Sequence, residues 1–394
     1  MKILIAEDDP YSRRLLQRRL EKWGHEVVAA KDGLEAWELF RKEPCSLVIS
    51  DWMMPGIDGL ELIRRIRQHP TDGYIYTVLL TAKDRKEDLI LGMETGADEY
   101  LTKPFDADEL NVRLRAGERI INLEKNLADR NRKLEAINQR MKKDLEIAAQ
   151  IQASLLPRSK PEVEELAFGW VFRPCDELAG DIFNVFPLDE HHVAFYVLDV
   201  SGHGVPAALL SVTLSRLLSP SEKDSGLLVR KNDQGERLIV SPAEVANQLN
   251  RRFPLEETTE QYFTILYGIV NIQSRKMRFV SAGHPEVLYL PATGLSQIIE
   301  TSSMPIGFSE FFTYEERELQ LAPGDRIFLY SDGIVEARNP AGELWGKERF
   351  LESLETGKNL DIQKVVDNQI DKISDWTQRE GFEDDVTLLG IEVR

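Results

Sequence analysis

Acidic residues follow several short apolar runs near the start of the chain. Glu7 and Asp8 come directly after the run ILIA, and Asp51 directly follows SLVIS. Thr81 ends the run YTVLLT, and Lys103 lies further along in YLTKPF. Carboxylates that meet at one place repel one another unless a cation lies among them, and hard oxygen ligands suit Mg²⁺. Such a site can accept a phosphoryl group on Asp51, with Lys103 offsetting the added charge.

Four aspartates further along the chain form a second set. Asp199 lies at the end of the apolar run HVAFYVLDV, and the others lie at the end of an apolar run or in a turn beside one: Asp181, Asp332 and Asp384. Taken singly, each would be interpreted as a turn residue or a helix cap. Together, in a region with few histidine or cysteine ligands, they indicate oxygen-coordinated Mg²⁺ or Mn²⁺ rather than zinc.

The stretch FYVLDVSGHGVP also offers a different chemistry, a serine hydrolase with Ser201 as nucleophile and His203 as its base. The two residues lie in one turn, with no Gly-x-Ser-x-Gly motif and no obvious oxyanion-hole partner. Residues so close in sequence seldom reach the geometry that a nucleophile and its base require. The sequence therefore favours Asp199 as the chemical residue of this stretch. His203 stays open as a general acid, as the weaker interpretation.

Elements must bring these residues together. Up to about residue 118, apolar runs typical of buried parallel strands alternate with stretches of helical spacing such as DGLELIRRIR. This alternation predicts an open, doubly wound α/β sheet, whose ligands gather at the carboxyl ends of the strands. Past Pro161, runs such as YFTILYGIVNI and RIFLYSDG predict an α/β sandwich, with sheet packed on sheet and helices outside. The polar stretch 219–240 is interpreted as a loop inserted at the surface.

One long helix is predicted between these two regions. From Asp106 to Leu156 there is no proline and only one glycine, and Pro157 then ends the helix. Apolar residues recur every seven positions, and others lie three residues after some of them: Ile120, Leu127, Leu134, Met141, Ala148 and Leu155, with Leu123, Ile137 and Ile151. This spacing is typical of a coiled-coil seam and favours a parallel homodimer over one amphipathic helix packed on its own domain.

Composition excludes several classes of partner. The net charge of −18 argues against nucleic acid as the main partner, because binding to phosphate backbones requires a basic surface. Cys45 and Cys175 lie far apart without metal-ligand spacing, which argues against disulfides and zinc. No apolar run reaches the roughly 20 residues that a membrane span needs, and no signal peptide precedes KILIA. We therefore expect a cytoplasmic protein without membrane contact.

Residues 1–118 resemble the receiver domain of bacterial two-component response regulators. The resemblance rests on IAEDDP, ISDWMMPGIDG, LLTA and TKPF in that order. It implies that Asp51 is the phosphoacceptor and that a cognate sensor histidine kinase supplies the phosphoryl group. It also implies that Glu7 and Asp8 line a Mg²⁺ site with Asp51, and that the carbonyl of Met53 is a further ligand.

The same resemblance implies a switch pair, Thr81 and Tyr100. A hydroxyl that moves to hydrogen-bond the new phosphate vacates space that an aromatic ring can fill. Lys103 is the lysine that such a site needs. A local change of charge at Asp51 would in this way become a change of the receiver surface.

Residues from about 146 to 394 resemble the metal-dependent (PPM-type) serine/threonine phosphatase family, in its bacterial branch that acts in sporulation and stress partner switching. The motifs are EIAAQIQASLLP, RPCDELAGDIF, LDVSGHG, SAGHPE, YSDGIVEARNPAGELWG and DDVTLL. The resemblance implies that Asp199 and the carbonyl of Val200 bind metal, and that Asp181, Asp332 and Asp384 complete a site for two Mn²⁺ or Mg²⁺ ions. Such ions lower the pKa of a bridging water and neutralise phosphoryl charge, so no phosphoenzyme is needed.

The combined prediction is a response regulator whose output is a protein phosphatase. We expect a receiver domain at 1–118, a coiled-coil linker helix at 119–157 and a phosphatase domain at 158–394. By resemblance, the substrate is a phosphoserine or phosphothreonine protein, an anti-sigma-factor antagonist. The alternative is a phosphorylation-gated adaptor that binds a regulatory protein through a catalytically weak phosphatase-like domain. The presence of all four aspartates weighs against this alternative.

Overall fold

The computed structural model describes residues 1–43, 45–71, 73–82, 90, 92–219, 226–232, 234–255, 261–301, 303–379 and 381–394. The chain divides into two compact units, Met1–Arg140 and Met141–Arg394, and each is considered by itself. None of the described helices combines the length and the apolar composition that crossing a lipid bilayer requires.

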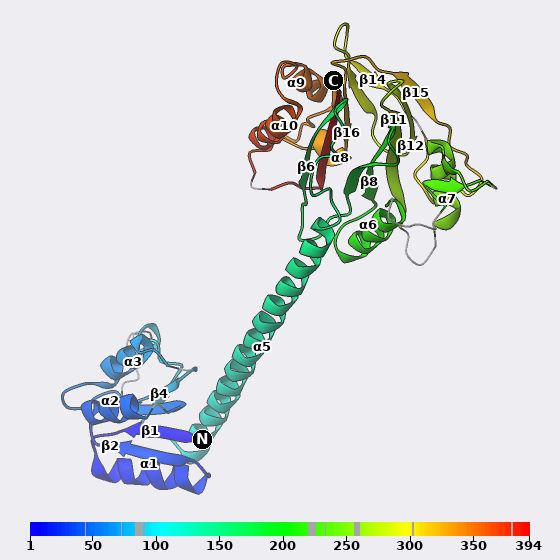
Figure 1. Cartoon of the computed structure of the whole chain (residues 1–394). Coiled ribbons are helices and arrows are strands. Elements are labelled where there is room, and N and C mark those ends of the chain that lie inside the picture. The colour runs from blue at the N-terminus through cyan, green and yellow to red at the C-terminus, as the bar shows by residue number, and fades with distance from the viewer. Residues whose placement is uncertain are drawn as a thin grey trace. The chain divides into compact units, whose positions relative to one another are not determined.

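The N-terminal unit is built on one parallel sheet with the strand order β2-β1-β3-β4-β5 (Figure 1). Its strands are β1 (Lys2–Ala6), β2 (Glu26–Ala30), β3 (Leu47–Asp51), β4 (Tyr76–Thr81) and β5 (Glu99–Thr102). Its helices are α1 (Pro10–Lys22), α2 (Gly33–Lys42), α3 (Gly59–Gln68) and the first part of α5 (Ala107–Ala153). The predicted doubly wound receiver fold is confirmed.

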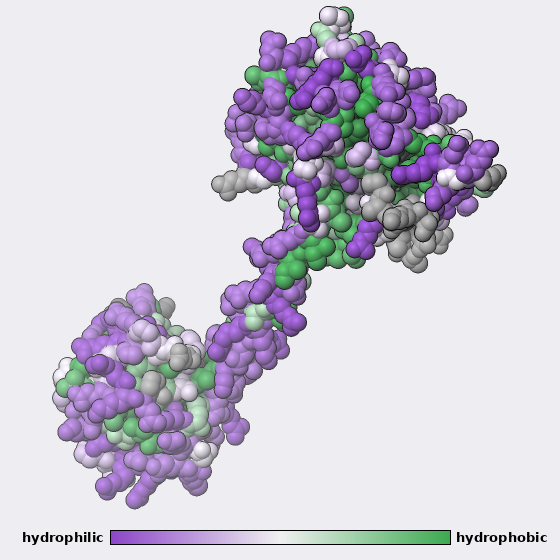
Figure 2. All heavy atoms as spheres, in the orientation of Figure 1, coloured by the Kyte–Doolittle hydropathy of each residue, from purple (hydrophilic) through white to green (hydrophobic). Residues whose placement is uncertain are grey.

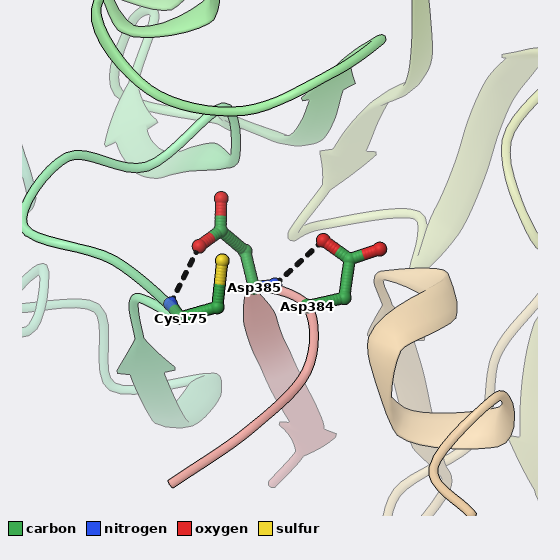
Figure 3. Close-up of side chains that lie close together, drawn as sticks. All are labelled: Cys175, Asp384 and Asp385. Carbon is green, nitrogen blue, oxygen red and sulfur yellow. Dashed lines mark hydrogen bonds between the residues drawn. The ribbon is translucent and has the colours of Figure 1, made fainter.

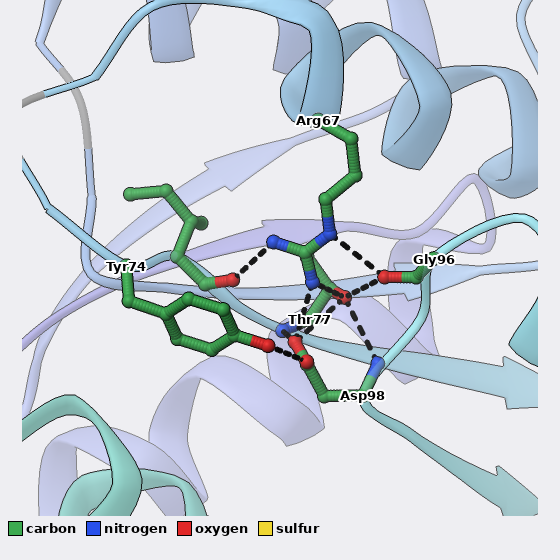
Figure 4. A network of polar contacts seen from close by, with 6 residues as sticks. Arg67, Tyr74, Thr77, Gly96 and Asp98 are labelled. Carbon is green, nitrogen blue, oxygen red and sulfur yellow. Dashed lines mark hydrogen bonds and ion pairs between the residues drawn. The ribbon is translucent and has the colours of Figure 1, made fainter. Parts of the chain in front are cut away.

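A polar network fixes the end of α3 and the approach to β5 (Figure 4). The Arg67 guanidinium donates to the carbonyl of Gly96 at 2.8 Å and to the Asp98 carboxylate at 2.6 Å. Asp98 also accepts from the backbone N–H of Thr77 at 2.7 Å and from the hydroxyl of Tyr74. Because β5 begins directly after Asp98, this network sets the position of the strand that leads to Lys103.

Helix α5 begins in the receiver and runs on into the C-terminal unit. Asp106 accepts a hydrogen bond from the backbone N–H of Glu109 at the start of the helix, and Leu110 and Leu114 are buried in the receiver core. Gly117 is the one glycine of the helix because a Cβ there would lie 2.5 Å from the ring of Tyr76. The long helix is confirmed, and it begins before the predicted linker at 119–157.

The C-terminal unit contains two five-stranded antiparallel sheets. One has the order β15-β12-β11-β8-β7, and the other β14-β13-β16-β17-β6. The strands are β6 (Leu166–Arg173), β7 (Ile182–Pro187), β8 (His192–Val200), β11 (Phe263–Asn271), β12 (Lys276–Ala282), β13 (Val287–Leu290), β14 (Gln297–Ile299), β15 (Arg317–Gln320), β16 (Arg326–Tyr330) and β17 (Val386–Val393). The helices after α5 are α6 (Val205–Leu217), α7 (Pro242–Arg252), α8 (Asp332–Val335), α9 (Lys347–Glu355) and α10 (Ile362–Thr377).

Three buried clusters show how these elements are layered. Side chains from both sheets, such as Phe195 and Leu389, form the central core between them. A second core lies between β7, β8, β11 and helices α6 and α7, and a third lies between β16, β17 and helices α9 and α10. The order helix, sheet, sheet, helix is the predicted α/β sandwich, and its strands can be followed in Figure 1.

The insertion at 219–240 is more ordered than a plain loop. Its described residues form a hairpin of β9 (Val229–Lys231) and β10 (Arg237–Ile239), while residues 220–225 and 233 lie outside the described part. Leu227, Leu228 and Val240 are buried in the core beside α6 and α7. Because the stretch is predominantly polar, its sequence did not indicate that these three apolar residues pack into the core of the sandwich.

Candidate metal centre and phosphoacceptor site

In the receiver, the loop after β1 and the end of β3 bring three acidic side chains together. The carboxylates of Glu7, Asp8 and Asp51 offer oxygen atoms within 4.8 Å of one another. The ammonium group of Lys103 donates to Glu7 Oε2 and to Asp51 Oδ2, each at 2.7 Å. Asp9 instead caps α1, because its side chain accepts from the backbone N–H of Ser12.

The acidic cluster is partly buried, and this affects its charge. Burial raises the pKa of Glu7, while the hydrogen bond from Lys103 opposes that shift. The guanidinium of Arg13 donates to the backbone carbonyls of Glu7 and Asp8 at 2.7 and 3.1 Å, which fixes the loop that carries them. The arrangement gathers oxygen ligands and a cation around the Asp51 carboxylate, which fits a divalent metal and an incoming phosphoryl group.

The remaining predicted receiver residues lie on neighbouring strands. Thr81 is fully buried at the end of β4, and its carbonyl accepts from the backbone N–H of Lys103 at 2.7 Å. Tyr100 on β5 is half-buried against the cluster that contains Trp52 and Leu79. Met53 follows Asp51 by two residues, and its side chain is exposed.

In the C-terminal unit, each of the two sheets contributes two aspartates to the same end of the sandwich. Asp181 immediately precedes β7 and Asp199 lies near the end of the adjacent β8. Asp332 begins α8 directly after β16, and Asp384 lies just before β17, which pairs with β16. Asp199, Asp332 and Asp384 line one cavity of about 510 Å³ with Val200, which we call the metal-site cavity.

The four aspartates crowd one another strongly. Burial and the charges of Asp332 and Asp384 raise the pKa of Asp199 to about 8. Burial and the charge of Asp384 raise that of Asp332 to about 6, and Asp181, which is almost fully buried, has a pKa well above its ordinary value. No lysine or arginine is among the described residues that line the metal-site cavity. Buried carboxylates that raise one another's pKa values, with no cationic side chain beside them, fit divalent metal ions.

Asp385 holds the loop that carries Asp181 against β17. Its carboxylate accepts from the backbone N–H groups of Cys175 at 2.8 Å, Gly180 at 2.7 Å and Asp181 at 3.2 Å. At Gly180, a Cβ would lie 2.9 Å from the carbonyl oxygen of Val200, so only glycine lets the two loops approach. This contact places the Asp181 loop beside the end of β8.

Cys175 was not expected near the acidic residues. Its sulfur lies within 4.8 Å of carboxylate oxygens of Asp384 and Asp385 (Figure 3). Burial and the charge of Asp385 raise the pKa of the Cys175 thiol to about 12, so the thiol is neutral.

Gln152, near the end of α5, was also missed. Its amide donates to the carbonyl of Ala179 at 2.7 Å and to the hydroxyl of Ser211 at 3.0 Å, and it accepts from the N–H of Ala179 at 3.1 Å. Gln152 is buried and is the last but one residue of the helix. The sequence carried a signal for it, because a glutamine at helical spacing from Ala148 and Ala149 interrupts an otherwise apolar face.

The serine hydrolase alternative finds no support in the local geometry. The Ser201 hydroxyl accepts from the backbone N–H of Tyr262 at 3.0 Å, and the N–H of Ser201 donates to the Tyr262 carbonyl. His203 is exposed and pairs with Asp176 at 3.1 Å rather than with Ser201. Ser201 therefore tethers the end of β8 to the segment before β11.

Comparisons with known proteins identify a family for the N-terminal part of the chain and another for the C-terminal part. Residues 3–115 match the response regulator receiver domain, and residues 189–394, more than half of the chain, match Stage II sporulation protein E. Phosphoserine phosphatase RsbP of Bacillus subtilis is 29% identical over 50% of this chain and 46% of its own length. Phosphoserine phosphatase RsbU of the same organism is 26% identical over 65% of this chain and 72% of its own.

Among solved structures, the SiaA-PP2C domain of Pseudomonas aeruginosa has the same fold as the C-terminal unit. It superposes with a TM-score of 0.55 at 20% identity, over 66% of this chain and 99% of that one. The chain thus spans less than half of the length of RsbP, and its receiver lies outside the match to Stage II sporulation protein E. With its sandwich and its four aspartates at one end, the chain belongs to the Stage II sporulation protein E family and carries a response regulator receiver domain before that part.

Proposed function

We propose that this protein is a receiver-controlled, metal-dependent phosphatase of phosphoserine or phosphothreonine proteins. The observation that carries the proposal is the meeting of Asp181, Asp199, Asp332 and Asp384 at one end of the sandwich. The relatives RsbP and RsbU are named phosphoserine phosphatases, which supports the same chemistry here. The domain bounds 1–118, 119–157 and 158–394 are part of the proposal.

The four aspartates and the carbonyl of Val200 would hold two Mn²⁺ or Mg²⁺ ions. Such ions supply the charge that neutralises a phosphoryl group and lower the pKa of the water that attacks phosphorus. The protein contributes the positions of the ligands: Asp385 fixes the loop of Asp181, and Ser201 tethers the segment after Asp199. Attack by water forms the new P–O bond, and the bond to the serine or threonine oxygen breaks without a phosphoenzyme.

In the receiver, Asp51 would take the phosphoryl group from a sensor histidine kinase, beside a Mg²⁺ held by Glu7, Asp8, Asp51 and the Met53 carbonyl. Lys103 already donates hydrogen bonds to both Glu7 and Asp51, so its ammonium group can pair with the phosphate once Asp51 is phosphorylated. Thr81 and Tyr100 would then act as the switch pair. The buried position of Thr81 and the half-buried ring of Tyr100 suit a change that begins inside the domain and reaches its surface.

The receiver would act on the phosphatase through α5. Gln152 joins the end of this helix to the backbone of Ala179, which lies two residues before Asp181. A change in the pairing or rotation of α5 would therefore change the placement of a proposed metal ligand. By resemblance to its family, the substrate of the regulated site is an anti-sigma-factor antagonist.

We also propose that the chain is a parallel homodimer through α5. The seam residues Leu127, Leu134 and Met141 are more than half exposed, as expected of side chains that await a partner helix. Leu155 lies beyond the end of α5 and packs against the core of its own unit, so the seam ends before it. Figure 2 shows a hydrophobic area where the C-terminal end of α5 meets α6, next to the proposed seam.

The decisive experiment measures hydrolysis of an aryl phosphate and of a phosphoserine protein with Mn²⁺. Wild type and Asp199→Ala are compared, with and without beryllofluoride to mimic phosphorylated Asp51. We expect activity that requires Asp199 and changes with beryllofluoride, and the direction of that change gives the sign of control. A folded protein that binds a regulatory partner but is inactive toward both substrates would establish the adaptor instead.

A further inference from the structure

A second cavity, of about 410 Å³, adjoins the metal-site cavity and shares Thr264 and Asp332 with it. We call it the flanking cavity, and the lining residues that matter are Thr264, His284, Glu300, Asp332, Glu336 and Lys347. Its size suits a side chain or a small ligand. Because the two cavities share a wall, a polypeptide whose phosphoserine enters the first can place a neighbouring side chain in the second.

His284 gives the flanking cavity an unused hydrogen-bonding atom. The side chain is 4% exposed, and its Nδ1 contacts the hydroxyl of Thr264 at 2.8 Å. Its Nε2 is buried and has no hydrogen-bond partner in the described part of the chain. Burial lowers the pKa of His284 to about 3, against a smaller opposing effect of the nearby backbone of Tyr330, so the imidazole is neutral. When Nδ1 carries the proton and donates to Thr264, Nε2 accepts, and a ligand with N–H groups satisfies it.

The charges around the flanking cavity are mostly negative. Lys347 is the only cationic side chain among its described lining residues, and it is already paired with Glu286. Glu300 and Glu336 are exposed, and neither forms an ion pair with another described residue. Two uncompensated carboxylates beside a buried acceptor favour a cation that donates hydrogen bonds.

We propose that the flanking cavity binds a basic side chain of the substrate, an arginine or a lysine near the phosphoserine, and so selects the phosphoprotein that is hydrolysed. The inference rests on the proposed function and deepens it. The cationic head would lie between Glu300 and Glu336, with one N–H group donated to Nε2 of His284. Selection would act on a residue that does not take part in the chemistry at phosphorus.

The test uses the full chain with Mn²⁺ and a set of phosphoserine peptides that carry arginine, alanine or glutamate at one neighbouring position at a time. We expect kcat/KM at one position to be roughly two- to fivefold higher for arginine than for alanine, and lower again for glutamate. The double variant Glu300→Gln/Glu336→Gln should bring the ratio of arginine to glutamate close to one. The matched control Glu352→Gln changes an exposed glutamate of α9 outside the cavity and should keep the ratio.

A second variant tests the histidine. His284→Asn can keep the hydrogen bond to Thr264 but removes Nε2, so it should weaken the preference for arginine while the number of bound Mn²⁺ ions stays the same in a calorimetric titration. Loss of one Mn²⁺ equivalent would make His284 a metal ligand and overturn the proposal. Equal rates for all peptides would overturn it while the phosphatase remains established by the aryl phosphate. Inactivity toward every substrate, aryl phosphate included, would remove the proposed function and this inference with it.

Discussion

At the scale of single residues, the acidic side chains of the proposed metal site destabilise the metal-free fold when they are ionised. Asp181 and Asp199 are brought together by adjacent strands, and burial with mutual repulsion raises their pKa values. Buried carboxylates that have no lysine or arginine partner need another cation, such as a metal ion, to neutralise their charge. The stability of the metal-free protein should therefore report on the site.

The first prediction concerns Asp199→Asn in metal-free protein. The pKa of Asp199 is raised to about 8, so its protonated form stabilises the fold fully below about pH 4, and this contribution is lost as the pH rises toward 8. The asparagine cannot ionise. We expect the variant to gain stability over wild type from pH 5 to pH 8, by on the order of a few kcal/mol at pH 8. Urea unfolding in EDTA measures the difference.

Added Mn²⁺ should make wild type more stable to unfolding than Asp199→Asn. Metal that binds only the folded state stabilises wild type in proportion to RT ln(1 + [L]/Kd), and Asp199→Asn should lose most of that gain together with its activity. Asp189→Asn is a suitable control, because Asp189 lies in the turn before β8 and pairs with His192. A wild-type stability that does not depend on pH or Mn²⁺ would contradict the assignment of Asp199 to a metal site.

The second prediction separates the two interpretations of the Ser-Gly-His-Gly turn. Ser201→Ala removes an acceptor for the N–H of Tyr262, so we expect a loss of about 1 kcal/mol in the free energy of unfolding. Hydrolysis of an aryl phosphate should persist, because the Ser201 hydroxyl is engaged in that tether. Complete loss of activity in a folded Ser201→Ala protein would instead indicate a nucleophilic serine.

At the scale of elements, the buried side chain of Gln152 joins the long helix to the loop that carries Asp181. Gln152 satisfies both backbone groups of Ala179, and the hydroxyl of Ser211 on α6 joins the same contact. Removal of Gln152 leaves buried polar groups without partners, at roughly 1–3 kcal/mol for each. The helix end, α6 and the Asp181 loop are thus stabilised together.

The third prediction is that Gln152→Ala weakens Mn²⁺ binding and lowers kcat, because the loop that carries Asp181 loses its attachment to α5. Calorimetric Mn²⁺ titration and aryl phosphate hydrolysis measure the two effects. Gln150→Ala is the matched control, since Gln150 is exposed on the same helix and its backbone carbonyl, which accepts from the N–H of Ser154, is kept in the variant. Equal effects of the two substitutions would show that Gln152 contributes only helix stability.

The elements themselves could be predicted well because their signals are local. Parallel strands such as β1 and β4 are short and predominantly apolar, and the absence of proline from Asp106 to Leu156 marks a helix. The contacts that complete the site depend on tertiary packing. Gln152 against Ala179 and Cys175 beside Asp385 join residues far apart in the sequence, and no periodicity places them together.

At the scale of the whole molecule, the chain joins a site proposed to accept a phosphoryl group to a site proposed to remove one. Acidic side chains that could surround a divalent cation lie at the strand ends of a parallel sheet and again at one end of a sandwich. Among the elements of the described residues, α5 alone belongs to both units. This helix is therefore the covalent route by which one site could control the other.

The fourth prediction tests the helix as a dimer seam. Leu134 is 57% exposed at a seam position, and burial of a leucine contributes about 1.5–3 kcal/mol. Leu134→Lys places a charge at that position in both chains, so we expect dimer dissociation to become at least tenfold easier in sedimentation equilibrium. Gln139→Lys adds the same charge on the opposite face of the helix and should leave the dimer intact.

The same pair of variants shows whether pairing transmits the signal. If α5 pairs in order to transmit it, Leu134→Lys should reduce the response of phosphatase activity to beryllofluoride, whereas Gln139→Lys should respond like wild type. The Mn²⁺ affinity of Leu134→Lys should stay close to the wild-type value, because the substitution lies outside the sandwich and leaves Gln152 in place. A monomeric Leu134→Lys protein with a full response would mean that the receiver acts within one chain, through the rotation of a single helix rather than through a pair.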